Sequence, residues 1–265
     1  MKTLVTGAAG GIGTQIVRRL RSKRELIAVD RDRDALNQLP NDVDTRAVDL
    51  TDEQAIQEEL SDEQVETLIS AVGWYELAAI EDCSPSSFEK HLATNLTAVH
   101  TPIYATLPTI RKHSGNIVIL GSVVGRVSLP YHGGYSASKA GLAGYTDTLR
   151  REVASKGVDV SLIEPGPIRT GFNERATSSL NNMSVSVYAE DYHHFRSYSP
   201  TSVSVDTVVD YIIAAIEADR PKARYRIGRR ARWLPWLQTI LPTRVFDRVV
   251  RSGLPGGLLH KLIDR

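Results

Sequence analysis

The chain has 265 residues, of which 42% are hydrophobic and 24% charged, and its net charge is +1. This length suits one α/β domain, and its single cysteine, Cys83, excludes an internal disulfide framework. No apolar run reaches the length of about 18 residues that a membrane-spanning helix needs, and no signal peptide is recognised. We therefore expect a single domain over residues 1–265, located in the cytoplasm.

Short apolar runs alternate with amphipathic stretches along the chain. Strands that alternate with helices indicate βαβ units and a parallel sheet, and right-handed crossovers place helices on both of its faces. Pro102 and Pro108 predict bends or a boundary within the longest helical stretch. The predicted strands are residues 2–6, 25–30, 45–49, 67–72, 116–120, 158–163 and 225–228, and the predicted helices are residues 13–20, 35–39, 52–60, 86–112, 135–155 and 206–218.

A polar, Ser/Asn-rich stretch interrupts this alternation at residues 171–205. We interpret it as a mobile segment over the functional site, with a plain surface loop as the alternative. His193 and His194 lie in it without metal-ligand spacing, so no metal site is predicted.

A glycine-rich turn follows the first predicted strand and opens the first predicted helix. Residues 6–13 read Thr-Gly-Ala-Ala-Gly-Gly-Ile-Gly. Glycines allow a tight turn and a close approach of pyrophosphate to the backbone, and a helix N-terminus offers free N–H groups and partial positive charge. A flexible surface turn is the alternative, but the strand before and the helix after favour a dinucleotide site.

An acidic residue, Asp30, ends the second predicted strand. A carboxylate at this position can accept hydrogen bonds from both hydroxyls of the adenosine ribose and repels a 2′-phosphate, so NAD is favoured over NADP. Arg31 and Arg33 follow directly and could hold that phosphate instead.

Tyr135 and Lys139 are four residues apart in a predicted helix and therefore share one face. A phenol is a poor base at neutral pH, and a neighbouring ammonium lowers its pKa. Tyr135 could then exchange a proton with an alcohol or carbonyl oxygen. Ser122 follows the fifth strand, at the sheet edge where ligands bind in such folds, and could hold the same oxygen.

These motifs together resemble the short-chain dehydrogenase/reductase family over about residues 1–170. The resemblance implies a Rossmann-type fold with about seven parallel strands, and hydride transfer between NAD(H) and an alcohol or carbonyl substrate. It also implies that Tyr135 is the general acid/base, that Lys139 lowers its pKa and holds the nicotinamide ribose, that Ser122 orients the substrate oxygen, and that Asn95 supports a relay water. The implied cofactor contacts are Gly7, Gly11, Ile12, Gly13, Asp30, Asp49, Leu50, Ala71, Val72, Gly73, Asn95, Tyr135, Lys139, Pro165, Gly166, Ile168 and Thr170.

One departure from the family pattern lies after the fourth strand, where residues 70–73 read Ser-Ala-Val-Gly instead of Asn-Asn-Ala-Gly. Ser70 can make fewer hydrogen bonds than asparagine, which puts the adenosine-side contacts in doubt. The glycine spacing also fits sugar-nucleotide epimerases and dehydratases of the longer branch. A regulator that binds NAD(P) without chemistry is a further alternative, although it need not keep the acid/base pair.

The C-terminal part of the chain is strongly basic. Residues 220–265 hold twelve Lys/Arg against two acids. Within residues 229–265, an apolar, tryptophan-bearing stretch could lie on a membrane surface, cover a hydrophobic substrate, contact another subunit, or form a plain terminal helix. Members of the family that act on steroid- or retinol-like alcohols have loosely similar extensions. No nucleic-acid-binding module accompanies the basic charge, so we expect no nucleic-acid partner. The family resemblance implies a homodimer or homotetramer.

Overall fold

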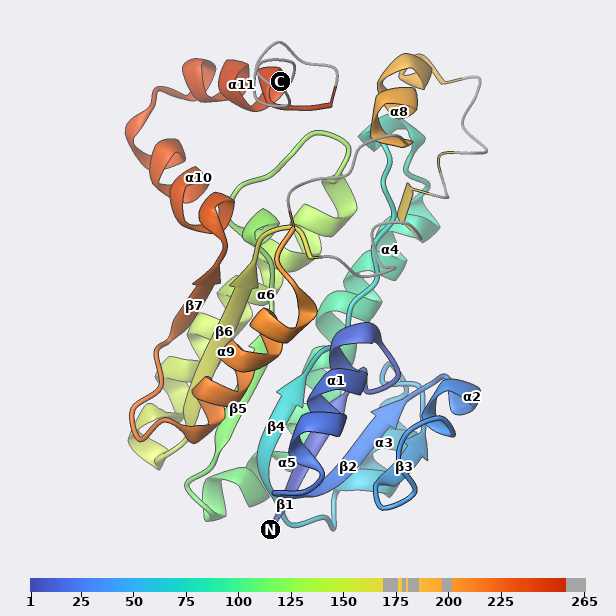
Figure 1. Cartoon of the computed structure of the whole chain (residues 1–265), viewed down its shortest axis with the longest axis vertical. Coiled ribbons are helices and arrows are strands. Elements are labelled where there is room, and N and C mark those ends of the chain that lie inside the picture. The colour runs from blue at the N-terminus through green and yellow to red at the C-terminus, as the bar shows by residue number, and fades with distance from the viewer. Residues whose placement is uncertain (169–175, 178–179, 181–185, 197–201, 256–265) are drawn as a thin grey trace.

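The fold is a seven-stranded, fully parallel sheet in the order β3-β2-β1-β4-β5-β6-β7, seen in a computed structural model (Figure 1). The structure describes residues 1–168, 176–177, 180, 186–196 and 202–255. This confirms the predicted doubly wound α/β sheet. The strands are β1 (Lys2–Thr6), β2 (Glu25–Asp30), β3 (Asp44–Ala47), β4 (Val65–Ser70), β5 (Asn116–Leu120), β6 (Asp159–Pro165) and β7 (Arg224–Ile227).

Helices cover both faces of the sheet, because successive strand residues point to opposite sides. Leu4 and Leu68 pack on one face with α3, α5 and α6, whereas Val5 and Ile69 pack on the other face with α1 and α9. The helices are α1 (Gly11–Leu20), α2 (Arg33–Leu36), α3 (Glu53–Leu60), α4 (Pro85–Leu92), α5 (Ala98–Lys112), α6 (Gly133–Val153), α8 (Ala189–Arg196), α9 (Val205–Glu217), α10 (Arg229–Ile240) and α11 (Thr243–Ser252).

The long helical stretch is interrupted at a π-helical turn, Ala93–Thr97, and not at either proline. Helix α5 runs through both Pro102 and Pro108. Of the two predicted outcomes, bends or a boundary at the prolines, the boundary is therefore wrong. The turn is centred on Asn95, whose side chain binds groups outside the helix, and such single π turns are frequent at functional sites.

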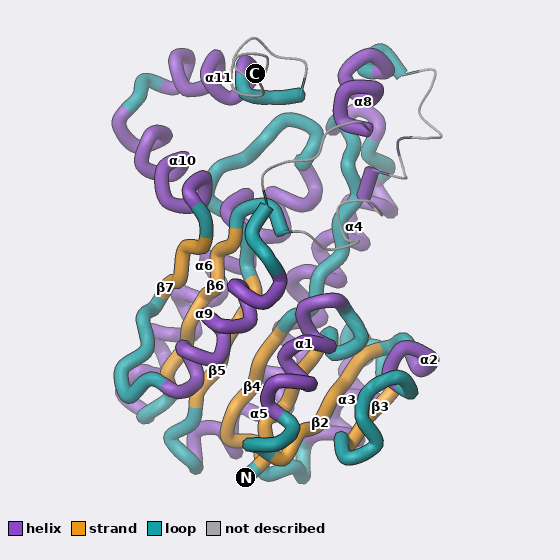
Figure 2. Tube along the Cα trace, viewed as in Figure 1, coloured by secondary structure: helices purple, strands orange, loops and turns teal. Residues whose placement is uncertain are grey.

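The carboxyl ends of the seven parallel strands, marked by the arrowheads in Figure 1, lie toward one end of the molecule. Figure 2 shows α8, α10 and α11 at that same end. Ligands bind at this edge in open α/β sheets. Of the stretch that we interpreted as mobile, α8 is described and residues 171–175, 178–179, 181–185 and 197–201 lie outside the described residues. Among the described helices, none is long and apolar enough to cross a lipid bilayer.

A group of ion pairs joins the edge strand β7 to β6 and α6. The Glu164 carboxylate of β6 is only 1% exposed. Arg224 pairs with it and with Asp147, whose Oδ2 lies 2.8 Å from Nη2 of Arg224. Arg226 Nε lies 3.5 Å from the second Glu164 oxygen. Asp147 also pairs with Arg150 at the surface.

Arg224→Met is expected to lower the free energy of unfolding by about 3 kcal/mol, because it leaves a buried carboxylate without its main partner. Arg150→Met is the matched control, since it removes only a partly exposed pair and should cost less than about 1 kcal/mol. Urea unfolding measures both values. Equal losses in the two variants would mean that Glu164 does not depend on Arg224.

Candidate functional site

The glycine-rich turn between β1 and α1 lies against the loop that follows β4. Gly7 has a positive φ of 71°, and a Cβ there would lie 2.8 Å from the backbone of Ala71. A Cβ at Gly13 would lie 2.1 Å from the Gly7 oxygen. The first N–H groups of an α-helix have no acceptor within the helix, and α1, which begins at Gly11, has no side-chain cap to bind them. The turn therefore has the shape and the free donors that a pyrophosphate requires.

Asp30, at the end of β2, reaches this turn. Its Oδ2 accepts a hydrogen bond from Ala9 N at 3.1 Å, and its Oδ1 accepts one from Asp32 N at 3.2 Å. The Asp30 carboxylate, which we predicted to select the cofactor, therefore lies beside the predicted phosphate site. Asp30 and Ala9 are 21 residues apart in the sequence.

The second acid of the predicted adenosine side, Asp49, has a strong local interaction. Its Oδ1 accepts bonds from Thr51 N at 2.9 Å and Thr51 Oγ1 at 2.7 Å. These bonds, with the charge of Arg31, lower the pKa of the Asp49 carboxyl. The next residue, Leu50, is buried among core side chains.

The loop at residues 71–73 starts where β4 pairs with β1, and Ala71 N donates to Thr6 O at 2.9 Å. Thr6 and Ser70 lie opposite each other in the two strands. Both hydroxyls are buried and have no hydrogen-bond partner among the residues that the structure describes. Ser70 therefore makes no side-chain bond there to a neighbouring strand, as its departure from the family asparagine suggested.

Asn95 fastens this loop to the helix that carries Tyr135. Its Oδ1 accepts from Trp74 N at 2.7 Å, and its Nδ2 donates to Trp74 O at 2.8 Å and to Ser138 Oγ at 2.9 Å. The side chain is fully buried. The sequence analysis missed Ser138, although its position three residues after Tyr135 was a usable signal.

Tyr135, Ser122 and Lys139 meet at the carboxyl edge of β5. Lys139 is 3% exposed, and its Nζ donates to Leu120 O at 2.9 Å and lies 6.0 Å from the centre of the Tyr135 ring. Burial lowers the pKa of Lys139 to about 8. A hydrogen bond joins Tyr135 to Ser122, whose Oγ also accepts from Val124 N at 3.3 Å.

The pKa of Tyr135 differs from the sequence expectation. Burial raises it to about 12, and the hydrogen bond with Ser122 opposes this rise only in part. The expected lowering by Lys139 is not seen, because the ammonium is directed to the Leu120 carbonyl and desolvation of the phenol dominates. The phenol is therefore protonated at neutral pH.

Aromatic side chains extend from Tyr135 toward α8. The Tyr75 ring lies 4.6 Å from that of Tyr135, and Tyr131 contacts Tyr192 and Phe195 of α8 at 5.8 and 5.2 Å between ring centroids. Tyr192 is bound through its hydroxyl to Ala79 N at 2.9 Å and to the Asp82 carboxylate. The sequence analysis missed Tyr192 and Phe195.

The residues predicted to contact the nicotinamide lie at and just after the carboxyl end of β6. Pro165 is the last residue of β6, Gly166 N donates to Ile227 O at 3.0 Å, and Ile168 forms a bridge with Val203. Thr170 lies outside the described residues.

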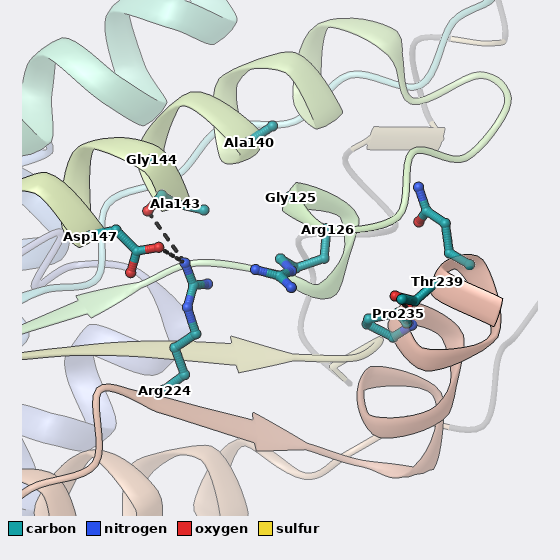
Figure 3. A pocket seen from close by; sticks show the side chains of 10 residues that line it. Gly125, Arg126, Ala140, Ala143, Gly144, Asp147, Arg224, Pro235 and Thr239 are labelled. Carbon is teal, nitrogen blue, oxygen red and sulfur yellow. Dashed lines mark hydrogen bonds and ion pairs between the residues drawn. The ribbon is translucent and has the colours of Figure 1, made fainter.

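A polar cavity of about 540 Å³ lies between α6, β7 and α10 (Figure 3). Arg126, Asp147 and Arg224 line it, and Pro235 and Thr239 of α10 close one side. None of the predicted site residues lines this cavity.

Comparison with known proteins gives consistent similarities over most of the chain. A profile described as short chain dehydrogenase matches residues 2–181. A probable short-chain type dehydrogenase/reductase VdlC from Helicobacter pylori is 30% identical over 96% of this chain and 97% of its own length. Human 17-beta-hydroxysteroid dehydrogenase type 1 is 28% identical over 89% of this chain and 79% of its own.

Solved structures agree with these sequence similarities. A short chain dehydrogenase from Burkholderia cenocepacia in complex with NADP superposes with a TM-score of 0.76, at 23% identity, over 94% of this chain and 96% of that chain. An oxidoreductase of the short chain dehydrogenase/reductase family from Burkholderia thailandensis has a TM-score of 0.68 at 31% identity, over 82% and 85% of the two chains.

Proposed function

Since the chain belongs to the short-chain dehydrogenase/reductase family, we propose that it moves a hydride between NAD and an alcohol/carbonyl pair, with Tyr135 as the general acid/base. The observation that carries this proposal is the meeting of Tyr135, hydrogen-bonded to Ser122, with the buried Lys139 ammonium at the sheet edge. The glycine turn and Asp30 lie at the same edge.

The residues present fit a dinucleotide. The close contact of Gly7 with Ala71 and the uncapped start of α1 suit a pyrophosphate, and Asp30 suits the adenosine ribose. Pro165, Gly166 and Ile168 would contact the nicotinamide end. When bound, the nicotinamide supplies or accepts the hydride.

Tyr135 would hold the proton that balances the hydride. During carbonyl reduction, its Oη gives this proton to the substrate oxygen as the carbon–hydrogen bond forms, and during alcohol oxidation it takes the proton back. A pKa of about 12 suits the acid role at neutral pH, whereas the base role requires added positive charge near the phenol. Ser122 would orient the substrate oxygen by its own hydroxyl.

Asn95 would act as a positioning residue. Its amide bonds to Trp74 and Ser138 keep the loop after β4 at a fixed distance from the Tyr135 helix. That Asn95 supports a relay water stays a prediction. The π turn around Asn95 is the kind of local irregularity in a helix that such a role would use.

The aromatic surroundings of Tyr135 favour a bulky, apolar substrate. The half-buried rings of Tyr75 and Tyr131 form an aromatic wall between the acid/base centre and α8, because Tyr75 stacks on His132, and His132 and Tyr131 both contact Phe195. Tyr192, which is fully buried, supports Tyr131 from the core. Among the relatives are proteins named hydroxysteroid and retinol dehydrogenases. We infer a secondary alcohol or ketone on a ring or long-chain skeleton.

The proposal is tested by following absorbance at the band of reduced nicotinamide with NAD and NADP against steroids, retinoids, simple alcohols, sugars and acyl thioesters. Turnover of apolar alcohols or ketones at the highest kcat/KM is expected. Cofactor binding by titration calorimetry without turnover on any compound would indicate a regulator. Retention of NAD through purification with activity on a nucleotide sugar would indicate an epimerase or dehydratase.

Asp30→Asn is expected to lower kcat/KM with NAD, and to raise it with NADP, by about tenfold to a hundredfold each, because the charge is lost while an acceptor for Ala9 N remains. Asp34→Asn on α2 removes the same charge away from the turn and should leave the ratio unchanged. Steady-state kinetics with both cofactors measures this ratio. A wild-type preference for NADP would assign the 2′-phosphate to Arg31 and Arg33 instead.

A further inference from the structure

The outward face of α10 is apolar and aromatic. Trp233, Trp236 and Ile240 are 58%, 51% and 52% exposed. With Arg229 they occupy positions i, i+4, i+7 and i+11, which share one face of a helix. The two indole rings contact each other edge-to-face at 5.5 Å, so they form one continuous surface.

The opposite face of α10 is the one that packs on the protein, and its residues are small or polar. Ala231 is buried against Val123 and Val124, and Pro235 and Thr239 close the polar cavity (Figure 3). A helix that folds against a protein core normally buries its large apolar side chains and exposes its polar ones. Helix α10 has the reverse arrangement, so its tryptophans serve something outside the fold.

Helix α11, which follows α10 directly, has a basic exposed face. Phe246 is its buried residue, and Arg244, Arg248 and Arg251 are exposed at positions i, i+4 and i+7. These three arginines form no ion pair with any residue that the structure describes. Six arginines and one acid, Asp247, occur across residues 229–252.

The inward face of the helix that carries these tryptophans lies beside the candidate active site. Helices α10 and α11 stand at the carboxyl end of the sheet (Figure 1), and the cluster of Val123, Val124 and Ala231 also contacts Tyr135.

We propose that α10 and α11 bind the surface of an anionic phospholipid membrane, with Trp233 and Trp236 at the boundary between headgroups and acyl chains and the arginines on lipid phosphates. Amphipathic, arginine-rich helices with exposed tryptophan bind such interfaces without spanning them. The membrane would supply an apolar substrate, but lipid binding itself does not depend on the proposed catalysis.

Charge disfavours a second copy of the chain as the occupant. In a two-fold dimer the same patch faces itself, which would bring the arginines of both copies together with one acid each. Anionic lipid complements this charge.

Co-flotation of the full chain with phosphatidylcholine vesicles, with and without phosphatidylglycerol, tests the proposal. Binding is expected to vesicles that contain phosphatidylglycerol, with at least tenfold less binding to phosphatidylcholine alone. Trp233→Ser with Trp236→Ser should lower binding at least tenfold, and Tyr104→Ser, which removes another exposed aromatic residue on α5, should not. Charge reversal of Arg244, Arg248 and Arg251 to Glu should lower binding about a hundredfold or more, since each basic residue contributes about fivefold.

The matched charge control reverses Arg18, Arg111 and Lys156, which are exposed elsewhere, and should keep most of the binding. Wild-type protein that floats with neither vesicle would overturn the proposal. Equal loss in both charge variants would reduce it to nonspecific charge attraction and would also reject it. A Trp233/Trp236 variant that turns a wild-type dimer into a monomer in light scattering, without vesicle binding, would assign the surface to a subunit contact.

Discussion

Tyr135→Phe is expected to lower kcat by about 10²- to 10⁴-fold, the range that a general acid/base contributes, while cofactor affinity stays within about twofold. The change removes one hydroxyl and leaves the ring that packs against Tyr75 in place. In the proposed mechanism, the Tyr135 hydroxyl supplies the proton that the substrate oxygen must gain or lose. The neutral hydroxyl of Ser122 cannot take over this proton transfer. Single-turnover absorbance measures the chemical step, and fluorescence titration measures cofactor affinity.

Tyr145→Phe is the matched control for this loss. Tyr145 lies on the same helix, and its hydroxyl bonds His100 at 3.0 Å, away from Ser122 and Lys139. Its substitution should keep kcat within about twofold. A Tyr135→Phe variant that turns over the best substrate of the panel at the wild-type rate would reject Tyr135 as the acid/base.

Lys139→Met should also lower turnover, by about 10²-fold or more, and yet leave the folded protein at least as stable near pH 7. The ammonium is buried, and burial lowers its pKa from 10.5 to about 8. At neutral pH this buried charge costs about 3 kcal/mol of folding free energy, which the methionine removes, while the bond to Leu120 O is lost.

The pH dependence of stability distinguishes this charge from a plain packing residue. Between pH 8 and 10.5 the unfolded chain binds more protons at Lys139 than the folded chain, so wild-type stability should rise with pH across this window relative to Lys139→Met. Below pH 8 both states carry the proton, and the difference should be constant. Urea unfolding of the cofactor-free proteins measures it, and a flat difference up to pH 10.5 would contradict a buried ammonium.

The fold was predictable because its signal is periodic and local. Strands with alternating core contacts, such as Leu4 and Val5 of β1, and the helices between them follow from hydrophobic pattern alone. The break in the long helix was not predictable in this way. It depends on Asn95 binding Trp74 and Ser138, two contacts that exist only after folding.

The candidate site also has parts that could be predicted from the sequence and parts that could not. Gly7, Asp30, Ser122, Tyr135 and Lys139 follow strands or share a helix face, so topology brings them to one edge of the sheet. The aromatic wall could not be anticipated, because Tyr192 and Phe195 lie in a polar segment without periodicity. The pKa of Tyr135 was mispredicted because sequence spacing shows charges but not desolvation.

The role of the C-terminal helices could not be predicted from residue spacing. Their tryptophans and arginines are equally compatible with a membrane surface, a hydrophobic substrate, another subunit or a plain terminal helix. The contacts of Ala231 and Phe246 decide which faces turn inward, and thereby which side chains meet the surroundings.

The Asn95 amide has a consequence for how this enzyme scaffold can diversify. Two of its three bonds hold Trp74, and the third holds Ser138. Trp74 directly precedes the stretch that supports α8, where Ala79 and Asp82 bind Tyr192. Tyr75 packs on the Tyr135 ring, so it belongs with the proposed acid/base centre. Substitutions beyond it, at residues 76–82, would reshape the aromatic wall without touching Tyr135 directly. Under the proposed function, selectivity and chemistry would then be separable traits, and residues 76–82 would be the natural place to begin altering substrate range by directed evolution.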